Sequence, residues 1–221
     1  MRKIIVFLFL GTTTLLVAQS SDESAEKKVQ PEVYLGLGAS LQNKFTLNDN
    51  LKAGGVAELN EVMPELLIGL NVFGKQFSGD AEFGFSMSKN NFANTEIRNI
   101  GFTSRIRFHY NIINKEKVAF TSGLNISATT SEVDLFTRNN AVDLNNLGAL
   151  DSNHISLQNQ LFYVGPSVSL YLLKHKSTAI RVNLGYEFAF TNGKWKSDFA
   201  DINNGVKENG NNRFVFGILI Q

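Results

Sequence analysis

The sequence predicts an all-β fold, an eight-stranded antiparallel up-and-down transmembrane β-barrel, on the strength of three observations. Eight segments alternate apolar and polar residues, and the apolar side of every segment is free of charged residues. Glycines and long polar side chains occupy the opposite side. A period of two residues places alternate side chains on opposite faces of a strand, so each strand has one face in an apolar medium.

The predicted strands follow one another from residue 33 to the end of the chain. In the first, Val33, Leu35 and Leu37 alternate with Tyr34 and Gly36. The predicted strands cover residues 33–41, 66–74, 81–87, 100–112, 118–128, 162–172, 180–190 and 214–220. The residues on the apolar side that are not themselves apolar are Gly74, Ser104, Ser122 and Pro166.

The side of the strands that carries charge decides which way the barrel faces. A soluble barrel would turn its apolar side inward, but the interior of eight strands holds only a modest filling of side chains. The many phenylalanines on the apolar side would not fit there, whereas glycines mixed with arginines would. The apolar side therefore faces lipid, where an Arg or Lys at the bilayer midplane costs about 2–4 kcal/mol.

The N-terminus predicts export. Arg2 and Lys3 precede an apolar stretch over residues 4–18, which is the order of a signal peptide. The stretch is shorter than a membrane-spanning helix needs to be. We expect a signal peptide over residues 1–18, cleaved after Ala18 or after Ser20. A polar leader over 19–31 and a barrel domain over 32–221 follow.

Charge and cysteine content exclude several classes. Without Arg2 and Lys3 the chain has 19 basic residues against 20 acidic ones, so nothing favours nucleic acid as a partner. The chain has no cysteine, which excludes a disulfide framework and a lipid-anchored cysteine. We expect no cofactor and no metal.

The lengths of the connections alternate. Short turns are expected near residues 76–79, 113–116 and 173–177, and long loops at 42–63, 88–99, 129–161 in part, and 191–212. Short turns on one side and long loops on the other are typical of an outer-membrane barrel with periplasmic termini.

The chain resembles the small outer-membrane β-barrel proteins of the OmpX/OmpA-barrel type, in the form common in Bacteroidetes. The motifs that carry the resemblance are Leu-Leu-Val-Ala-Gln at 15–19, Tyr-Leu-Gly-Leu-Gly at 34–38, Val-Gly-Pro-Ser-Val at 164–168, residues 181–188 and Arg-Phe-Val-Phe-Gly at 213–217. The resemblance implies architecture, not activity. It also implies the outer membrane as location, crossed several times, with its lipid and the barrel-assembly machinery as partners. Gln221 stands where such proteins often have a terminal aromatic residue.

The polar side of the strands predicts a network of charges in the lumen. A hairpin register with residue numbers summing to 187 places Glu82 opposite Arg105 and Asp80 opposite Arg107, and opposed charges of opposite sign attract. The predicted lumen charges are Glu65, Asp80, Glu82, Arg105, Arg107, His109, Arg181, Glu187 and Arg213. Either they form a gated pore or proton path, or they neutralise a filled lumen, which is the interpretation that we favour.

Two further motifs bear on chemistry. His154 and Ser156 resemble the His-x-Ser pair of the outer-membrane lipid A deacylases, but Leu157 replaces that family's Asn and Val168 stands where it has an acid. The loop over 198–212 carries oxygen ligands, yet its spacing differs from an EF-hand loop. A solvated loop is favoured there, with Trp195 and Phe199 at the outer membrane interface.

These observations predict a non-enzymatic outer-membrane barrel. It would contribute to envelope structure, or contact an extracellular or envelope protein through four long extracellular loops. The alternatives are an outer-membrane lipid hydrolase, a narrow channel and a soluble carrier of a small ligand.

Overall fold

The structure is a computed structural model, which describes residues 30–137, 154–174, 179–198, 200–203 and 205–221. The expected signal peptide and nearly all of the polar leader lie outside the described residues. The elements in chain order are β1 (Pro31–Gln42), α2 (Leu47–Ala53), β2 (Val62–Phe73), β3 (Phe77–Phe92), β4 (Thr95–Asn114), β5 (Val118–Thr137), β6 (His154–Leu172), β7 (Ile180–Ala189), β8 (Gly193–Lys194), β9 (Lys207–Glu208) and β10 (Arg213–Ile220).

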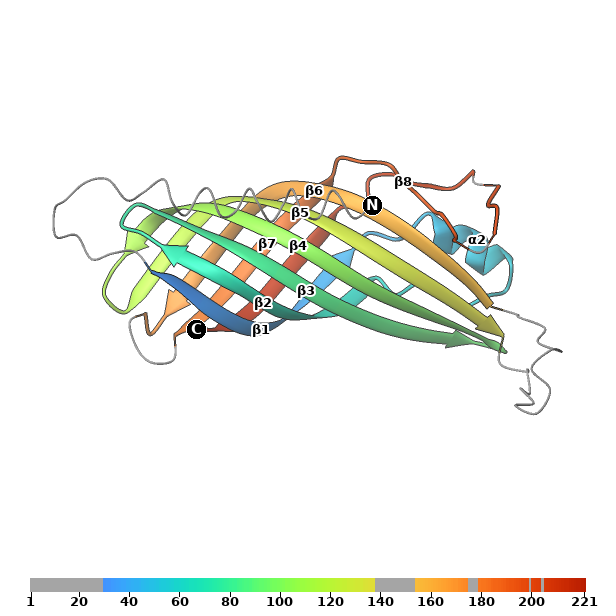
Figure 1. The fold of residues 1–221 in the computed structure, drawn as a ribbon, viewed down its shortest axis with the longest axis horizontal. Coiled ribbons are helices and arrows are strands. Elements are labelled where there is room, and N and C mark those ends of the chain that lie inside the picture. Colours follow the sequence, from blue (N-terminus) through green and yellow to red (C-terminus); the bar gives the residue numbers. More distant parts are fainter. Residues whose placement is uncertain (1–29, 138–153, 175–178, 199, 204) are drawn as a thin grey trace.

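Eight of the strands close into a barrel, which confirms the predicted fold class. The order around the barrel is β1-β10-β7-β6-β5-β4-β3-β2, and every neighbouring pair is antiparallel. The strands cross the barrel obliquely, as closure requires (Figure 1). The short strands β8 and β9 pair only with each other, outside the barrel.

The outer face of the barrel is apolar, as the alternation predicts. Leu37 is 69% exposed, and Phe77 and Met87 are exposed to a similar extent. Outward-facing aliphatic and aromatic side chains on all eight barrel strands form an apolar belt, with aromatic pairs such as Phe83–Phe102 within it. These side chains are half-buried on β6, and each of the other seven strands carries largely exposed ones. Such a belt fits the hydrocarbon layer of a membrane, and charged residues are absent from it among the described residues.

Strands β3 to β6 are longer than the sequence predicts. The expected long loop over 88–99 is wrong, because β3 and β4 continue as a ladder to Phe92 and Thr95 and turn through two residues. There Ala93 has a φ of 49°. Beyond Met87 on β3 and Ile100 on β4, the residues on the outer face are polar. These parts of the strands, the strand extensions, therefore lie outside the apolar belt. There the sequence no longer shows the alternation of apolar and polar residues from which a strand could be predicted.

The connection between β1 and β2 contains an α-helix that the sequence pattern does not predict. Helix α2 is seven residues long, with Leu47 and Asn48 buried. It lies beside β8 at one end of the barrel, and the C terminus lies near the other end (Figure 1). Among the described residues, no helix has the length and apolarity needed to cross a membrane.

Candidate functional site: a filled lumen and its cap

The predicted lumen charges come from five strands, and all of them are buried. Arg105 and Arg181 are 2% and 0% exposed, although both are long, charged side chains. The nine residues are Glu65 on β2, Asp80 and Glu82 on β3, Arg105, Arg107 and His109 on β4, Arg181 and Glu187 on β7, and Arg213 on β10. They lie inside the barrel because they share the parity opposite to the apolar belt.

Pairs of neighbouring strands bring opposite charges together. The ladder between β3 and β4 places Glu82 opposite Arg105 and Asp80 opposite Arg107, in the register that the sequence predicts. Both pairs are ion pairs, and Arg107 Nη1 lies 2.9 Å from Asp80 Oδ1. On β7 and β10, Glu187 Oε2 accepts a hydrogen bond of 2.7 Å from Arg213 Nε.

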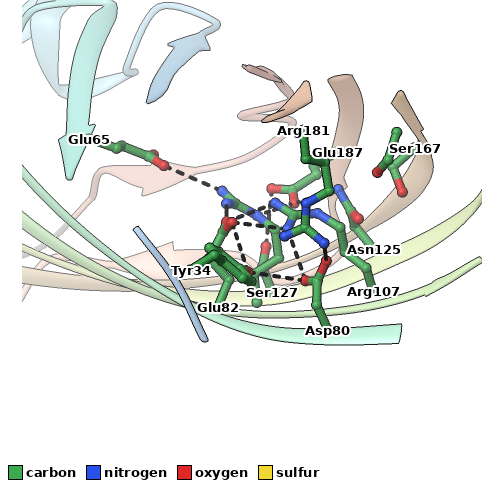
Figure 2. Close-up of polar contacts among 12 residues, drawn as sticks. Tyr34, Glu65, Asp80, Glu82, Arg107, Asn125, Ser127, Ser167, Arg181 and Glu187 are labelled. Atoms are coloured by element: carbon green, nitrogen blue, oxygen red, sulfur yellow. Dashed lines mark hydrogen bonds and ion pairs between the residues drawn. The ribbon is translucent and has the colours of Figure 1, made fainter. Parts of the chain in front are cut away.

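Other ion pairs cross the lumen. Arg105 Nε on β4 lies 3.1 Å from Glu187 Oε1 on β7, and Arg181 Nη1 on β7 lies 2.9 Å from Asp80 Oδ2 on β3. Figure 2 shows the side chains of Asp80, Arg181 and Glu187 converging on one centre. Glu65 Oε2 lies 3.6 Å from Arg105 Nη2. Four arginines face four carboxylates, so the network is neutral, as a buried group of charges must be to avoid a large desolvation cost.

Aromatic and neutral side chains fill the space that the charges leave. The Arg181 guanidinium lies 4.3 Å from the centre of the Tyr34 ring, and Arg213 lies 4.0 Å from that of Tyr163. Gly69 makes room for this packing, since a Cβ there would overlap the Tyr34 hydroxyl. Tyr171, which the inward parity assigns to the lumen, also hydrogen-bonds within the network. The predicted lumen charges have further neutral partners of the same parity, which the prediction does not name: Asn71, Asn125, Ser127 and Thr129.

His109 stands apart from the ion pairs. Its Nδ1 lies 2.7 Å from Thr121 Oγ1, and its Nε2 lies 2.6 Å from Ser167 Oγ. Hydroxyl groups on β5 and β6 therefore satisfy both ring nitrogens. His109 belongs to the lumen filling but contacts no carboxylate through a hydrogen bond or ion pair that the described residues make.

A compact cap of connecting segments lies over one end of the barrel. It consists of the β1–β2 connection with α2 and the β7–β10 connection with β8 and β9. Its apolar core joins Phe45 and Leu59 to Trp195 and packs against Ile97 and Val133, which point inward from the strand extensions. Because these two face the barrel axis, the cap covers the lumen at this end.

One buried carboxylate holds the two halves of the cap together. Glu208 on β9 is 0% exposed, and its oxygens accept hydrogen bonds from the Thr46 and Leu47 backbone N–H groups at 2.8 and 3.0 Å. Trp195 Nε1 and Asn211 Nδ2 donate two more, at 2.8 and 2.9 Å. The prediction of a solvated loop with Trp195 at the membrane interface is therefore wrong for Glu208 and Trp195, which are buried. The Phe199 position lies outside the described residues.

The cap also covers the free edges of the strand extensions. Gln158 on β6 exchanges two backbone hydrogen bonds with Lys196, at 2.7 and 2.9 Å. On the other edge, Asn90 Nδ2 of β3 donates to the Glu58 carbonyl at 2.9 Å. An uncovered edge is a template for pairing with another chain, and both edges have contacts here that oppose such pairing.

The His-x-Ser pair lies on the outer face of the strand extensions. Asp134 on β5 supplies an acid that the sequence pattern did not reveal, with its Oδ1 3.0 Å from His154 Nε2. The Ser156 hydroxyl, however, donates to Glu132 Oε1 at 3.4 Å, and Asp134 is also paired with Arg98 at 2.7 Å. The serine is thus aimed at a carboxylate, where a nucleophile would need the imidazole.

The pKa of the Asp134 carboxyl group is lowered by its neighbours. It stands beyond the apolar belt, on the polar outer face. Partial burial raises the pKa of Asp134, but hydrogen bonds from Arg98 and His154 outweigh that effect and hold the pKa below its ordinary value. The carboxylate is therefore kept charged as the centre of a surface ion-pair cluster.

The connection over 198–212 does not bring its acids together. Asp198 accepts a hydrogen bond from Gln158, and Glu208 points into the cap. The described residues include no group of three or more His, Cys, Asp or Glu side chains that could hold a metal ion.

Comparison with known proteins finds similarity of structure alone. No protein-family model and no curated protein matches the sequence. Among solved structures, Ail, the attachment invasion locus protein of Yersinia pestis, has a TM-score of 0.49 at 9% identity, with 88% of this chain and 97% of that chain covered. Neisserial surface protein A has a TM-score of 0.45 at 9% identity, with 86% and 97% covered. A major outer membrane protein of Thermus thermophilus has a TM-score of 0.49 at 7% identity, with 86% and 98% covered.

Proposed function

We propose that this protein is a closed, non-enzymatic outer-membrane barrel that presents its cap as a fixed contact surface outside the cell. The observation that carries the proposal is the filling of the lumen by a neutral ion-pair network, with the cap over one end. A barrel of eight strands built this way has no passage for solutes. What it offers to its surroundings is the outer surface of the cap.

The proposal requires the cap to be extracellular and the short turns to be periplasmic. The chain has no cysteine, so a single introduced cysteine is a unique label. We expect Asn50→Cys, in the exposed turn of α2, to react with a membrane-impermeant maleimide on intact cells. The matched variant Lys115→Cys, exposed in the β4–β5 turn, should react only after the outer membrane is opened.

The reverse labelling pattern, or recovery of the protein without detergent from the periplasm, would overturn the proposal. The second outcome would instead favour a soluble carrier.

The lipid-hydrolase alternative has its own test. If Ser156 were a nucleophile, expression of the protein would reduce the number of acyl chains on lipid A, and Ser156→Ala would abolish the change. We expect identical lipid A from cells with the wild type, the variant and the empty vector. Loss of acyl chains that depends on Ser156 would replace the proposed function with an enzymatic one.

A further inference from the structure

Lysines gather at the end of the barrel opposite the cap. Lys75 lies in the β2–β3 turn, Lys115 and Lys117 in the β4–β5 turn, and Lys174 in the β6–β7 turn. Lys75, Lys115 and Lys117 are exposed. Three turns that are far apart in the chain thus carry basic residues to the same rim.

Asn114 ties the three turns into one patch. Its side-chain Nδ2 donates to the Lys75 carbonyl at 2.9 Å, and its Oδ1 accepts a hydrogen bond from the Lys174 ammonium group. The Lys174 backbone N–H also donates to the Lys117 carbonyl at 3.2 Å. The four lysines are therefore held side by side, not spread around the rim.

The charge at this rim differs from that of the rest of the molecule. The described residues of the rim carry these four lysines against the two acids Glu32 and Glu116, whereas the lumen network is neutral. At the cap end, acidic residues outnumber basic ones in the described part of the chain. The rim is thus the one described zone with an excess of positive charge.

The patch lies directly beside the apolar belt. Ile113, 43% exposed, and Val118, 37% exposed, flank the β4–β5 turn, so Lys115 and Lys117 stand within two residues of lipid-facing side chains. The edge-on ring pair Phe77–Tyr110, with centroids 5.6 Å apart, marks the same level, where aromatic side chains prefer the membrane interface. Lysines at this distance reach into the headgroup layer.

We propose that this lysine patch binds the phosphates of anionic phospholipid headgroups in the adjoining leaflet. The ammonium group of lysine binds phosphate as a point charge, and basic residues beside a membrane are attracted to anionic lipid. The position favours lipid over a soluble partner, because the flanking side chains are already in the hydrocarbon layer. The inference takes from the proposed function only the identity of the leaflet, which is the periplasmic one.

Native mass spectrometry of the purified barrel in detergent tests this inference. The folded protein is titrated with phosphatidylglycerol or with zwitterionic phosphatidylcholine of the same acyl chains, and the retained lipid is measured. The test variant is Lys75→Gln/Lys115→Gln/Lys117→Gln. Lys174 is left intact because its ammonium group packs 4.0 Å from the centre of the Phe73 ring. The matched control neutralises three exposed lysines of the cap end, Lys52→Gln/Lys194→Gln/Lys207→Gln.

We expect the wild type and the control to retain phosphatidylglycerol in preference to phosphatidylcholine by about tenfold, and the test variant to lose most of that preference. Heat-modifiable gel mobility establishes that all three are folded. Equal retention of both lipids by the wild type would overturn the inference, as would an equal loss in the control. So would a patch-dependent preference for anionic peptidoglycan fragments without one for anionic lipid. None of these outcomes depends on the cysteine labelling, which tests sidedness separately.

Discussion

The lumen and the cap both bury charged side chains, but they are built in different ways. In the lumen, the β-ladders place every charged side chain, and the register that puts Glu82 opposite Arg105 also sets the rest of the network. In the cap, two segments far apart in the chain meet around Trp195. Side-chain contacts and a backbone hydrogen bond of 2.9 Å from the Asn43 N–H to the Asn212 carbonyl hold them together. The positions of the charged side chains in the lumen thus follow from strand register, whereas the cap depends on packing between connecting segments.

The two regions also compensate buried charge differently. Glu187 in the lumen faces the guanidinium groups of Arg105 and Arg213. In the described part of the chain Glu208 has no ion pair, and four neutral N–H groups solvate its carboxylate instead. Removing one side of an ion pair leaves a full uncompensated charge, whereas removing part of a hydrogen-bond set leaves unsatisfied donors. The lumen should therefore be the more sensitive region.

The largest effect is expected from Arg105→Ala. Loss of this guanidinium leaves Glu82 and Glu187 short of a cation in a buried network, which should cost about 3–5 kcal/mol of unfolding free energy. Urea unfolding of the barrel in lipid vesicles, followed by heat-modifiable mobility, measures the loss. Adding Glu82→Gln should recover part of it, because the network is then closer to neutral.

Arg98→Ala is the matched control on the same strand. The Arg98 side chain is 43% exposed and pairs with Asp134 beyond the apolar belt, so its removal should cost about 1 kcal/mol or less. If Arg98→Ala and Arg105→Ala lowered the unfolding free energy equally, an arginine that points into the lumen would contribute no more to stability than one on the outer face.

A smaller and more local effect is expected from Glu208→Gln. The neutral amide is a weaker acceptor for the four donors and brings N–H groups of its own, so the cap should lose about 1–3 kcal/mol while the barrel is unchanged. Trp195 is the only tryptophan of the chain and reports on the cap alone through its fluorescence. Its emission should shift at lower urea than in the wild type, with the barrel transition at the same urea concentration.

Asp201→Asn, at an exposed position in the same connection, serves as the control and should leave both transitions in place. If Glu208→Gln moved the barrel transition together with the fluorescence, the two regions would form one cooperative unit.

The smallest effect concerns pH. The pKa of Asp134 is lowered, so its pairing stabilises the strand extensions above the ordinary aspartate pKa and is lost as the pH falls through the lowered folded-state value. The contribution should therefore be complete at neutral pH, begin to fall near the ordinary aspartate pKa of about 4, and be gone once the pH is below the lowered folded-state value. NMR titration of the Asp134 carboxyl should give a midpoint below the ordinary value, and Arg98→Ala should raise it. An unchanged midpoint in the variant would remove Arg98 as a cause.

The sequence allowed the barrel and most of its lumen to be predicted because both depend on one periodicity. Within the apolar belt, a residue such as Phe85 must face lipid, and its neighbour Gly84 must then face inward. The same parity assigned Arg105 to the lumen, and the opposed charges gave the register of the hairpin. Pairs across the lumen, such as Arg181 with Asp80, depend on barrel closure, which no local pattern encodes.

The cap could not be predicted for the opposite reason. Its core joins Phe45 to Trp195, and no periodic pattern links residues so far apart in the chain. The strand extensions were missed because neither of their faces meets lipid. Ile97 on the inner face is covered by the cap, and Arg98 on the outer face is polar, so the apolar-outward alternation that predicts the barrel strands is absent there. Asp134 was missed as the partner of His154 because it lies on a neighbouring strand.

The central claim is that the lumen is closed by its own side chains, with the cap as a second and independent layer. Planar-bilayer recording of purified monomer, with the wild type and Glu208→Gln compared, tests this claim most directly. We predict only brief, small conductance from both, because loosening the cap leaves the ion-pair network in place. Sustained conductance from either one, or sugar uptake into liposomes that contain it, would contradict the claim.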